Sequence, residues 1–136
     1  MKATLIAFSP LGRSLLTDKP HSFKKAQTIA FLKGNPRFLE PNLSLNIQIT
    51  SKFREYALDN SMSAAQLSLS WLLNRNKNLI PIPGTRSSEH LKSMAKAAYT
   101  ELNEIQMKEI DDILPLGWAH GDRYSEHQWM GPEKYC

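Results

Sequence analysis

Residues 79–88 read LIPIPGTRSS. The apolar half of this stretch predicts a short strand, and its two prolines, which cannot donate to a ladder, limit the expected pairing to the first residues. Gly84 then predicts a turn, and either Ser87 or Ser88 can cap a following helix. The stretch therefore predicts a strand, a tight loop and a helix in direct succession.

Residues 5–13 read LIAFSPLGR and predict a second, buried strand that also runs into a loop. Ligands of parallel α/β folds bind at the carboxyl ends of the strands, where both loops are expected to lie. The loop after residue 83 also opens a helix, whose free N–H groups favour phosphate, and Arg86 adds a charged fork. A plain turn followed by a helix cap explains the same residues and stays an alternative.

Four segments show helical signals. The first covers about residues 45–58, the second follows a cap at Ser63, the third follows residue 88, and the fourth begins with an Asn103–Gln106 capping box and stops at Pro115. The apolar residues expected to face inward are Ile49, Phe53, Tyr56 and Ala57, then Ala65, Leu69, Leu72 and Leu73, then Leu91, Met94, Ala95 and Ala98, and finally Met107, Ile110, Ile113 and Leu114. Residues 17–44 are expected to form a long loop, and residues 116–136 an irregular tail. Two parallel strands alone make a poor sheet, because a parallel sheet needs both faces covered and its edges paired. The predicted order of elements therefore implies that the strands leave surfaces that further structure has to cover.

Composition narrows the class of protein. The chain has 136 residues, of which 41% are hydrophobic and 22% charged, as in an ordinary globular domain. The net charge of +4 suits an anionic small molecule, and the scattered basic residues do not favour nucleic acid. No apolar run is long enough to cross a membrane, and the four histidines match no common zinc spacing. Cys136 is the only cysteine, which together with the lack of a signal peptide predicts a cytoplasmic location.

The ordered motifs of the chain resemble those of the aldo-keto reductases. Residues 6–13 resemble the seventh barrel strand and its loop, and residues 35–38 (NPRF) with Asn42 and Asn46 resemble the stretch that follows. Residues 65–73 (AQLSLSWLL) resemble the family's AQLALAWLL helix, residues 80–86 its eighth strand and phosphate loop, and residues 121–124 (GDRY) a tail motif of one branch. The resemblance runs over essentially the whole chain in the family's order.

This resemblance implies an NADP(H)-dependent carbonyl or aldehyde reductase, represented by the C-terminal portion of a (β/α)8 TIM barrel with two parallel strands, about four helices and a tail. It assigns residues 1–16 to strand seven and the pyrophosphate loop, 17–44 to a long loop, 45–78 to helices, 79–99 to strand eight with its phosphate loop and helix, 100–115 to the C-terminal helix and 116–136 to the tail. The cofactor-binding residues that it implies are Ser9, Pro10, Leu11, Gly12, Arg13, Pro83, Gly84, Thr85, Arg86 and His90. Arg123 and Tyr124 are the implied substrate-loop residues.

The chain also departs from the family. Ser14 stands where the family has a second glycine, and Ser93 and Met94 replace a Glu–Asn pair that contacts adenine. The family's catalytic Asp, Tyr, Lys and His lie in the first half of the barrel, so no catalytic residue is assigned and we expect a truncated chain that is inactive alone. Two alternatives stay open: half of a split barrel completed by a partner chain or a second copy, and a non-catalytic helical module.

Overall fold

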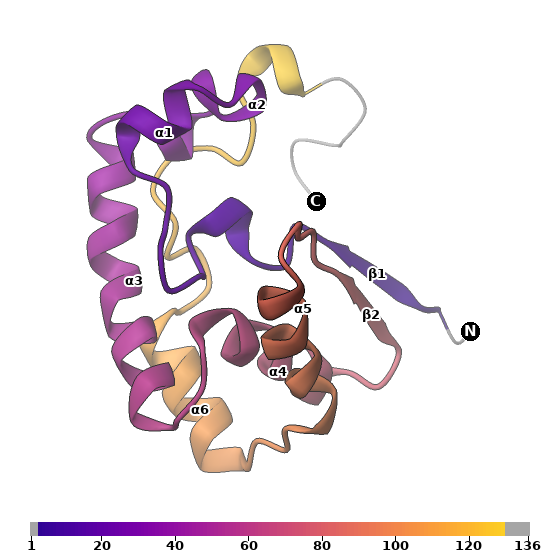
Figure 1. Cartoon of the computed structure of the whole chain (residues 1–136). Helices are drawn as coiled ribbons and strands as arrows, with labels where there is room; N and C mark the ends of the chain where they lie inside the picture. The colour runs from indigo at the N-terminus through magenta and orange to yellow at the C-terminus, as the bar shows by residue number, and fades with distance from the viewer. Residues whose placement is uncertain (1–2, 130–136) are drawn as a thin grey trace.

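The computed structural model describes residues 3–129, which form two strands and several helices (Figure 1). The strands are β1 (Leu5–Phe8) and β2 (Leu79–Ile82). The α-helices are α1 (Phe23–Gln27), α2 (Ala30–Lys33), α3 (Asn42–Asp59), α4 (Ala64–Arg75), α5 (Ser88–Ala95) and α6 (Glu104–Ile113). Four 3-10 helices complete the described part: η1 (Gly12–Ser14), η2 (Pro36–Phe38), η3 (Lys96–Tyr99) and η4 (Glu126–Gln128).

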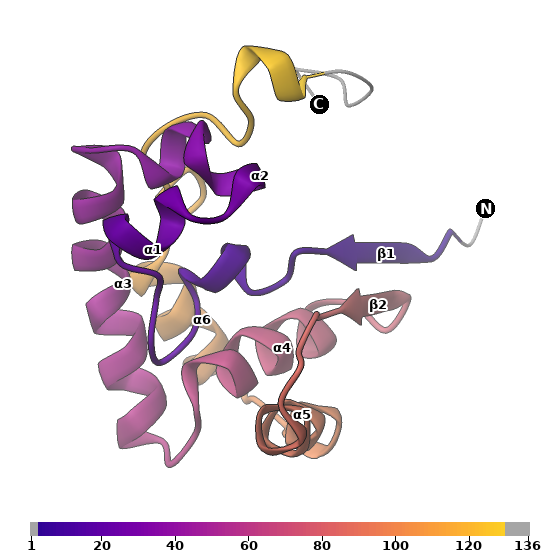
Figure 2. The ribbon, with the colours of Figure 1, turned by 45° about the horizontal axis from the view of Figure 1, so that its top comes forward.

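The two strands pair in parallel, as the sequence predicted. The register runs from Leu5 opposite Leu79 to Phe8 opposite Ile82, so pairing covers the whole of β2 and not only its first residues. Successive residues of a strand direct their backbone N–H groups to opposite sides. A proline is therefore tolerated at a position whose N–H would point away from the paired strand. Figure 2 shows both strands projecting from the helices, with α4 alongside β2.

The prediction that the first strand is buried is wrong for the described chain. Five apolar side chains of the sheet are 48–59% exposed: Leu5, Ile6, Phe8, Ile80 and Ile82. In β2 only Leu79 is buried, where the strand approaches α4. An apolar run indicates that a strand can be buried, but a second layer must cover it, and residues 3–129 cover little of this sheet.

Helix α4 forms the centre of the molecule and is buried on two sides. Leu67 packs with Phe53, Ala57 and Ile110 of α3 and α6, whereas Leu69 packs with Met94 and Ala97 of α5 and η3. The Ser63 cap is confirmed, since its hydroxyl accepts the N–H of Gln66. The sequence prediction found only the Leu69 side, because two apolar faces on one helix blur the periodic signal.

The predicted long loop over residues 17–44 is wrong. It contains α1, α2, η2 and the first turn of α3, and it contributes buried side chains to a third cluster: Ala26, Leu32, Phe38 and Leu43, packed on Leu15. Ser22 caps α1 and Asn35 caps η2 through their side-chain oxygens. Elements of three to five residues are too short to show a helical period, so pattern analysis reads them as loop.

The helices after β2 confirm the predicted caps but not every inward residue. Ser87 rather than Ser88 caps α5, and the Asn103–Gln106 capping box is present at α6. Met94 and Ile110 are buried, whereas Leu91, Ala95 and Ala98 are exposed, and Ala97 of η3 faces inward instead. Its place in a helical segment predicts that Tyr99 packs, but its side chain is 90% exposed. Within residues 3–129, no helix combines the length and the hydropathy that a bilayer crossing requires.

Candidate functional site

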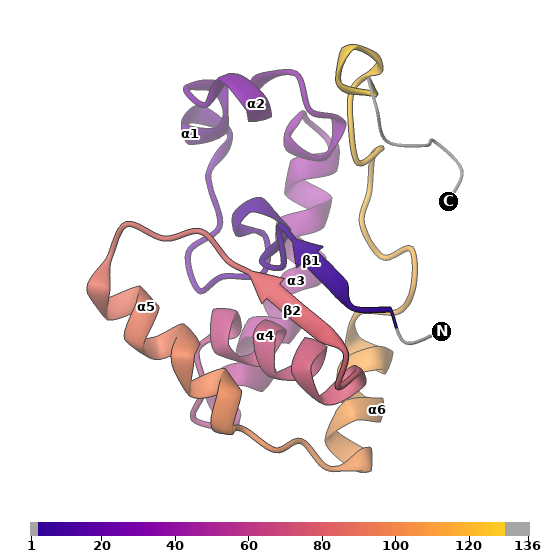
Figure 3. The same cartoon turned by 90° about the vertical axis from the view of Figure 1, so that its right-hand side faces the viewer.

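The carboxyl ends of the two strands meet at one edge of the sheet, where a cavity of about 880 Å³ opens. Figure 3 shows both strands running in the same direction, so the loops after Phe8 and Ile82 leave together. The cavity is lined by all the predicted cofactor residues except Gly12: Ser9, Pro10, Leu11, Arg13, Pro83, Gly84, Thr85, Arg86 and His90. The fold thus gathers two sets of residues that lie about seventy positions apart in the sequence.

The loop after β1 is a tight turn with an unusual backbone. Ser9, Gly12, Arg13 and Ser14 all have positive φ, with values of 49°, 56°, 55° and 91°. The turn is closed by hydrogen bonds from the N–H of Gly12 to the carbonyl of Ser9 and from that of Ser14 to Leu11. Ser14, which replaces the expected glycine, therefore adopts a conformation that glycine accepts at lower cost. Its hydroxyl accepts the N–H of His21, which ties the turn to the next segment.

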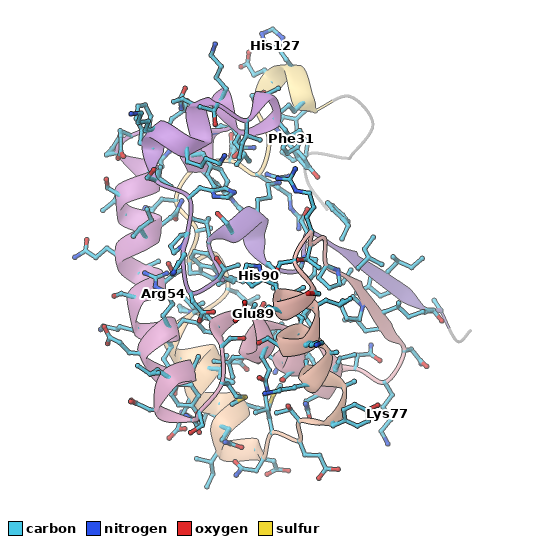
Figure 4. All side chains as sticks on the ribbon, viewed as in Figure 1. Phe31, Arg54, Lys77, Glu89, His90 and His127 are labelled. Carbon is cyan, nitrogen blue, oxygen red and sulfur yellow. The ribbon has the colours of Figure 1, made fainter. Side chains whose placement is uncertain are left out.

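The loop after β2 leads directly into the N-terminus of α5. The Thr85 hydroxyl accepts the N–H of Ser87, and the Ser87 hydroxyl accepts that of His90. Figure 4 shows His90 and Glu89 in the first turn of α5. Gly84 has no heavy atom within 4 Å of the place where a Cβ would lie, so the backbone there is open to a ligand. This arrangement places the positive end of a helix dipole beside the cavity.

The charge of the cavity lining is mostly positive. The lining contains three cationic side chains, those of Arg13, Lys19 and Arg86, and one carboxylate, that of Asp18. One oxygen of this carboxylate accepts the N–H of Ala64 at 2.8 Å. His21 also lines the cavity, and burial, aided by nearby Lys25, lowers its pKa. A cavity with this lining attracts anions.

Sequence reasoning missed Lys19 and His21 as lining residues. They lie in residues 17–44, which were predicted to form a loop, and no spacing signal joins them to the cofactor set. Their nearness to residues 9–14 in the chain was the one available signal. The turn at Ser14 folds this segment back onto the cavity through the Ser14–His21 hydrogen bond.

Two serine hydroxyls stand at the α4–α5 side of the cavity. Ser63 Oγ and Ser93 Oγ are 2.9 Å apart, and both residues line the cavity with Met94. Ser93 and Met94 are the residues that replace the family's Glu–Asn pair. This side of the cavity therefore presents small polar and apolar groups where a carboxylate and an amide were expected.

The tail reaches the carboxyl end of β1 through the Arg123 side chain, and polar side chains of residues 35–46 hold its backbone. Asn46, fully buried, donates to the carbonyl of His120 at 3.0 Å and accepts its N–H at 2.8 Å. Arg37 Nε donates to the carbonyl of Gly121, and Asn35 Nδ2 donates to that of Arg123 at 2.8 Å. The residues of the NPRF stretch and the asparagine that follows it thus fasten the tail.

The two predicted substrate-loop residues flank the cavity without lining it. The Arg123 guanidinium lies 5.2 Å from the centre of the Phe8 ring at the end of β1. Tyr124 is only 9% exposed and makes edge-on contacts with Phe31 of α2 and with Trp129. The ring of Tyr124 therefore packs against the rings of Phe31 and Trp129. Residues 130–136 of the predicted tail, with Cys136, lie outside the described residues.

Two tryptophans away from the cavity have structural contacts. Trp71 packs against the α3–α6 cluster and donates its Nε1–H to Asp111, and Trp118 packs against the cluster around Leu15. In the described part of the chain, no three His, Cys, Asp or Glu side chains gather closely enough to hold a metal ion.

Comparison with known proteins gives a consistent picture. The Aldo/keto reductase family model matches residues 3–115. A "Probable aldo-keto reductase 1" of Glycine max is 32% identical over 120 residues, which cover 88% of this chain and 34% of that protein. "Aldo-keto reductase yakc [NADP(+)]" of Schizosaccharomyces pombe is 31% identical over 124 residues, covering 89% and 36%. The chain thus spans about a third of the length of these relatives.

Solved structures agree on the fold. A thermostable aldo-keto reductase, Tm1743, in complex with the inhibitor epalrestat, aligns with a TM-score of 0.52 and 26% identity over 81% of this chain and 29% of that one. The glycerol dehydrogenase AKR11B4 of Gluconobacter oxydans aligns with a TM-score of 0.63 and 22% identity over 82% and 34%. Both are TIM barrels, so the two strands and the helices of this chain match part of a barrel.

Proposed function

The chain belongs to the aldo/keto reductase family, and on that basis we propose that the cavity at the ends of β1 and β2 binds NADP(H). The observation that carries this proposal is the gathering of Arg13, Lys19 and Arg86 around one cavity at the end of two parallel strands. The volume of about 880 Å³ is within the range of cofactor pockets. One homologue carries NADP(+) in its name, which supports the phosphorylated cofactor.

The residues of the cavity fit the parts of such a dinucleotide. In the proposal, the backbone turn at residues 9–13 follows the pyrophosphate, because its amide groups and Arg13 are suited to a diphosphate. Thr85, Arg86 and the start of α5 hold the 2′-phosphate, and the adenine lies toward His90 and Ser93. When bound, the cofactor would supply the hydride for reduction of a carbonyl group.

We further propose that this chain forms the seventh and eighth strands of a barrel and does not reduce carbonyls alone. The order of its motifs supports this placement. Tyr124, the tyrosine of residues 3–129 that lies beside the cavity residues Arg13 and Phe31, is packed between Phe31 and Trp129 and so is poorly placed to donate a proton. Mixing the chain with NADPH and an aromatic aldehyde should give no robust turnover, and turnover would overturn this part of the proposal.

Replacement of Arg86 by alanine tests the cofactor site. We expect NADPH to quench tryptophan fluorescence of the unmodified chain, and the Arg86→Ala variant to bind about 1.5–3 kcal/mol more weakly, because a charged phosphate contact is lost. The preference for NADPH over NADH should fall with it. Lys108→Ala is the control for loss of a positive charge, since Lys108 pairs with Asp112 on α6 and does not line the cavity. An absent response of the unmodified chain would favour the non-catalytic helical module.

A split barrel is the second candidate, favoured by the exposed sheet. Leu5, Ile6 and Phe8 of β1 and Ile80 and Ile82 of β2 present apolar area that a partner chain or a second copy would cover. Light scattering after size exclusion would show a complex or a dimer if this is so. A well-folded monomer at micromolar concentration would count against it.

A cytoplasmic location stays a prediction.

A further inference from the structure

We propose that Arg13 is a positioning residue that links the cofactor cavity to the tail, so that an anion in the cavity and the order of residues 120–129 support each other. The inference rests on the proposed function and goes beyond it, because it gives this side chain a second partner. Arg13 lines the cavity and at the same time contacts the tail.

The guanidinium of Arg13, on the β1 loop, contacts residues of two other segments. Its Nη1 donates to the carbonyl of Arg123 at 2.8 Å. Its central carbon lies 4.6 Å from the centre of the Phe31 ring and 4.9 Å from that of Tyr124. Figure 4 shows Phe31 on α2, beside the tail segment that carries η4. The β1 loop, α2 and the tail therefore meet on one planar cation.

The tail side of this contact is itself well packed. Tyr124 makes an edge-on contact with Trp129 at 5.1 Å between ring centres, and the Arg123 carbonyl that accepts from Arg13 also accepts from Asn35. Gln128 Nε2 donates to the carbonyl of Phe31 at 2.8 Å. Removal of Arg13 would leave these contacts in place but free the tail from the β1 loop. Among the hydrogen bonds of the described residues, the one from Arg13 is the bond that joins residues 9–14 to the tail.

The geometry explains why the two sites should be coupled. An arginine that donates one N–H to the tail keeps other N–H groups for an anion in the cavity. A bound phosphate would hold the guanidinium in place, and the fixed guanidinium would hold Arg123 and Tyr124. Linkage requires the converse, that an ordered tail strengthens phosphate binding by the same factor. The tail would thus close over the end of β1, where Arg123 already lies on Phe8, when the cofactor is present.

The first measurement is amide hydrogen exchange of the full chain with and without saturating NADPH. We expect peptides within residues 120–129 to exchange more slowly when NADPH is bound. In Arg13→Lys, which keeps the charge but loses the planar fork, the tail should exchange faster and NADPH should no longer slow it. Arg54→Lys is the control, because Arg54 lies on α3, bonds Thr50 and Ile47, and is not a cavity residue.

The second measurement is a double-mutant cycle on NADPH affinity. Gly121→Ala should release the tail, because its Cβ would lie 2.8 Å from the backbone of Pro36. It should weaken NADPH binding about fivefold or more, a usual size for coupled sites. In the Arg13→Lys background the same change should have less than about a twofold effect, since the link is already cut. A purely structural role of Arg13 would leave the effect of Gly121→Ala the same in both backgrounds.

The outcomes separate the inference from the proposed function. If NADPH binds but neither slows exchange of the tail nor responds to Gly121→Ala, the coupling is refuted and the cofactor site stands. If tail exchange in Arg13→Lys equals that of the unmodified chain, Arg13 is not the link. If NADPH does not bind the unmodified chain, the proposed function fails, and the coupling fails with it.

Discussion

Replacing Gly121 by alanine should detach the tail from the body of the protein. A Cβ at this position would lie 2.7 Å from Asn42 Nδ2 and 2.8 Å from both the carbonyl carbon and the oxygen of Pro36. Two of these three atoms belong to the backbone of η2, which cannot rotate out of the way. Gly121 also has a φ of 84°, in the left-handed region that alanine adopts at a cost.

The size of the effect follows from the contacts of the tail. The left-handed conformation alone costs an alanine about 1–2 kcal/mol. The clash must then be relieved by movement of the tail, which weakens four hydrogen bonds: two between Asn46 and His120, one from Arg37 to Gly121 and one from Asn35 to Arg123. At about 0.5–1.5 kcal/mol each, their complete loss would add roughly 2–6 kcal/mol. Together with the backbone cost, the free energy of unfolding should therefore fall by about 3–8 kcal/mol.

Gly117→Ala is the matched control. Gly117 lies in the same tail with a φ of 80°, but no heavy atom comes within 4 Å of its Cβ position. It should cost only the backbone term of about 1–2 kcal/mol. For a chain of this size 1 kcal/mol corresponds to roughly 3–5 °C, so the added 2–6 kcal/mol should separate the melting temperatures of the two variants by about 6–30 °C.

Urea denaturation followed by tryptophan fluorescence and by circular dichroism would measure both variants. Amide exchange should show that the loss of protection in Gly121→Ala is concentrated in residues 120–129. If Gly121→Ala and Gly117→Ala were equally stable, the close contact between the tail and η2 would not exist in solution. The role given to Asn35, Arg37 and Asn46 in fastening the tail would then be wrong.

Three further results are expected. Asn103→Ala removes the capping box of α6 and should lower the free energy of unfolding by about 1–2 kcal/mol in urea titrations, with no change if the cap is unimportant. Burial and Lys25 lower the pKa of His21 below 6.5, so the unfolded chain binds more protons as the pH falls. Stability should therefore decrease as the pH falls through 6.5, and His21→Gln should flatten that slope. Burial and the hydrogen bond to Glu109 raise the pKa of Tyr56 to about 12, above its ordinary value of 10, so its contribution to stability is complete below pH 10 and is lost as the pH rises toward 12. Absorbance at high pH should show this late ionisation, and Tyr56→Phe should abolish it.

The candidate site was only partly accessible to sequence reasoning. The β1 and β2 loops were identified because their strands, glycines and caps leave local signals, and the resemblance supplied their joint role. Lys19 and His21 were missed because their place on the cavity depends on the turn at Ser14, whose φ of 91° no propensity predicts for serine. The second partner of Arg13 was missed for a similar reason, since Arg123 is 110 residues away in the chain.

Local chemistry was enough to find the strands at residues 5–8 and 79–82, the caps at Ser63 and Asn103, and the stop at Pro115, because each depends on neighbours within a few residues. Burial was different. The same kind of apolar run is exposed in β1 and buried in α4, because burial depends on which elements pack against it. Fastening of the tail likewise needed the folded chain, since a buried amide such as that of Asn46 finds its partner at residue 120 only after α3 and the tail are in place. Contacts between residues far apart in the sequence leave no trace in local patterns. These contacts determine which residues line the cavity, the charge of that lining and the position of the tail beside it.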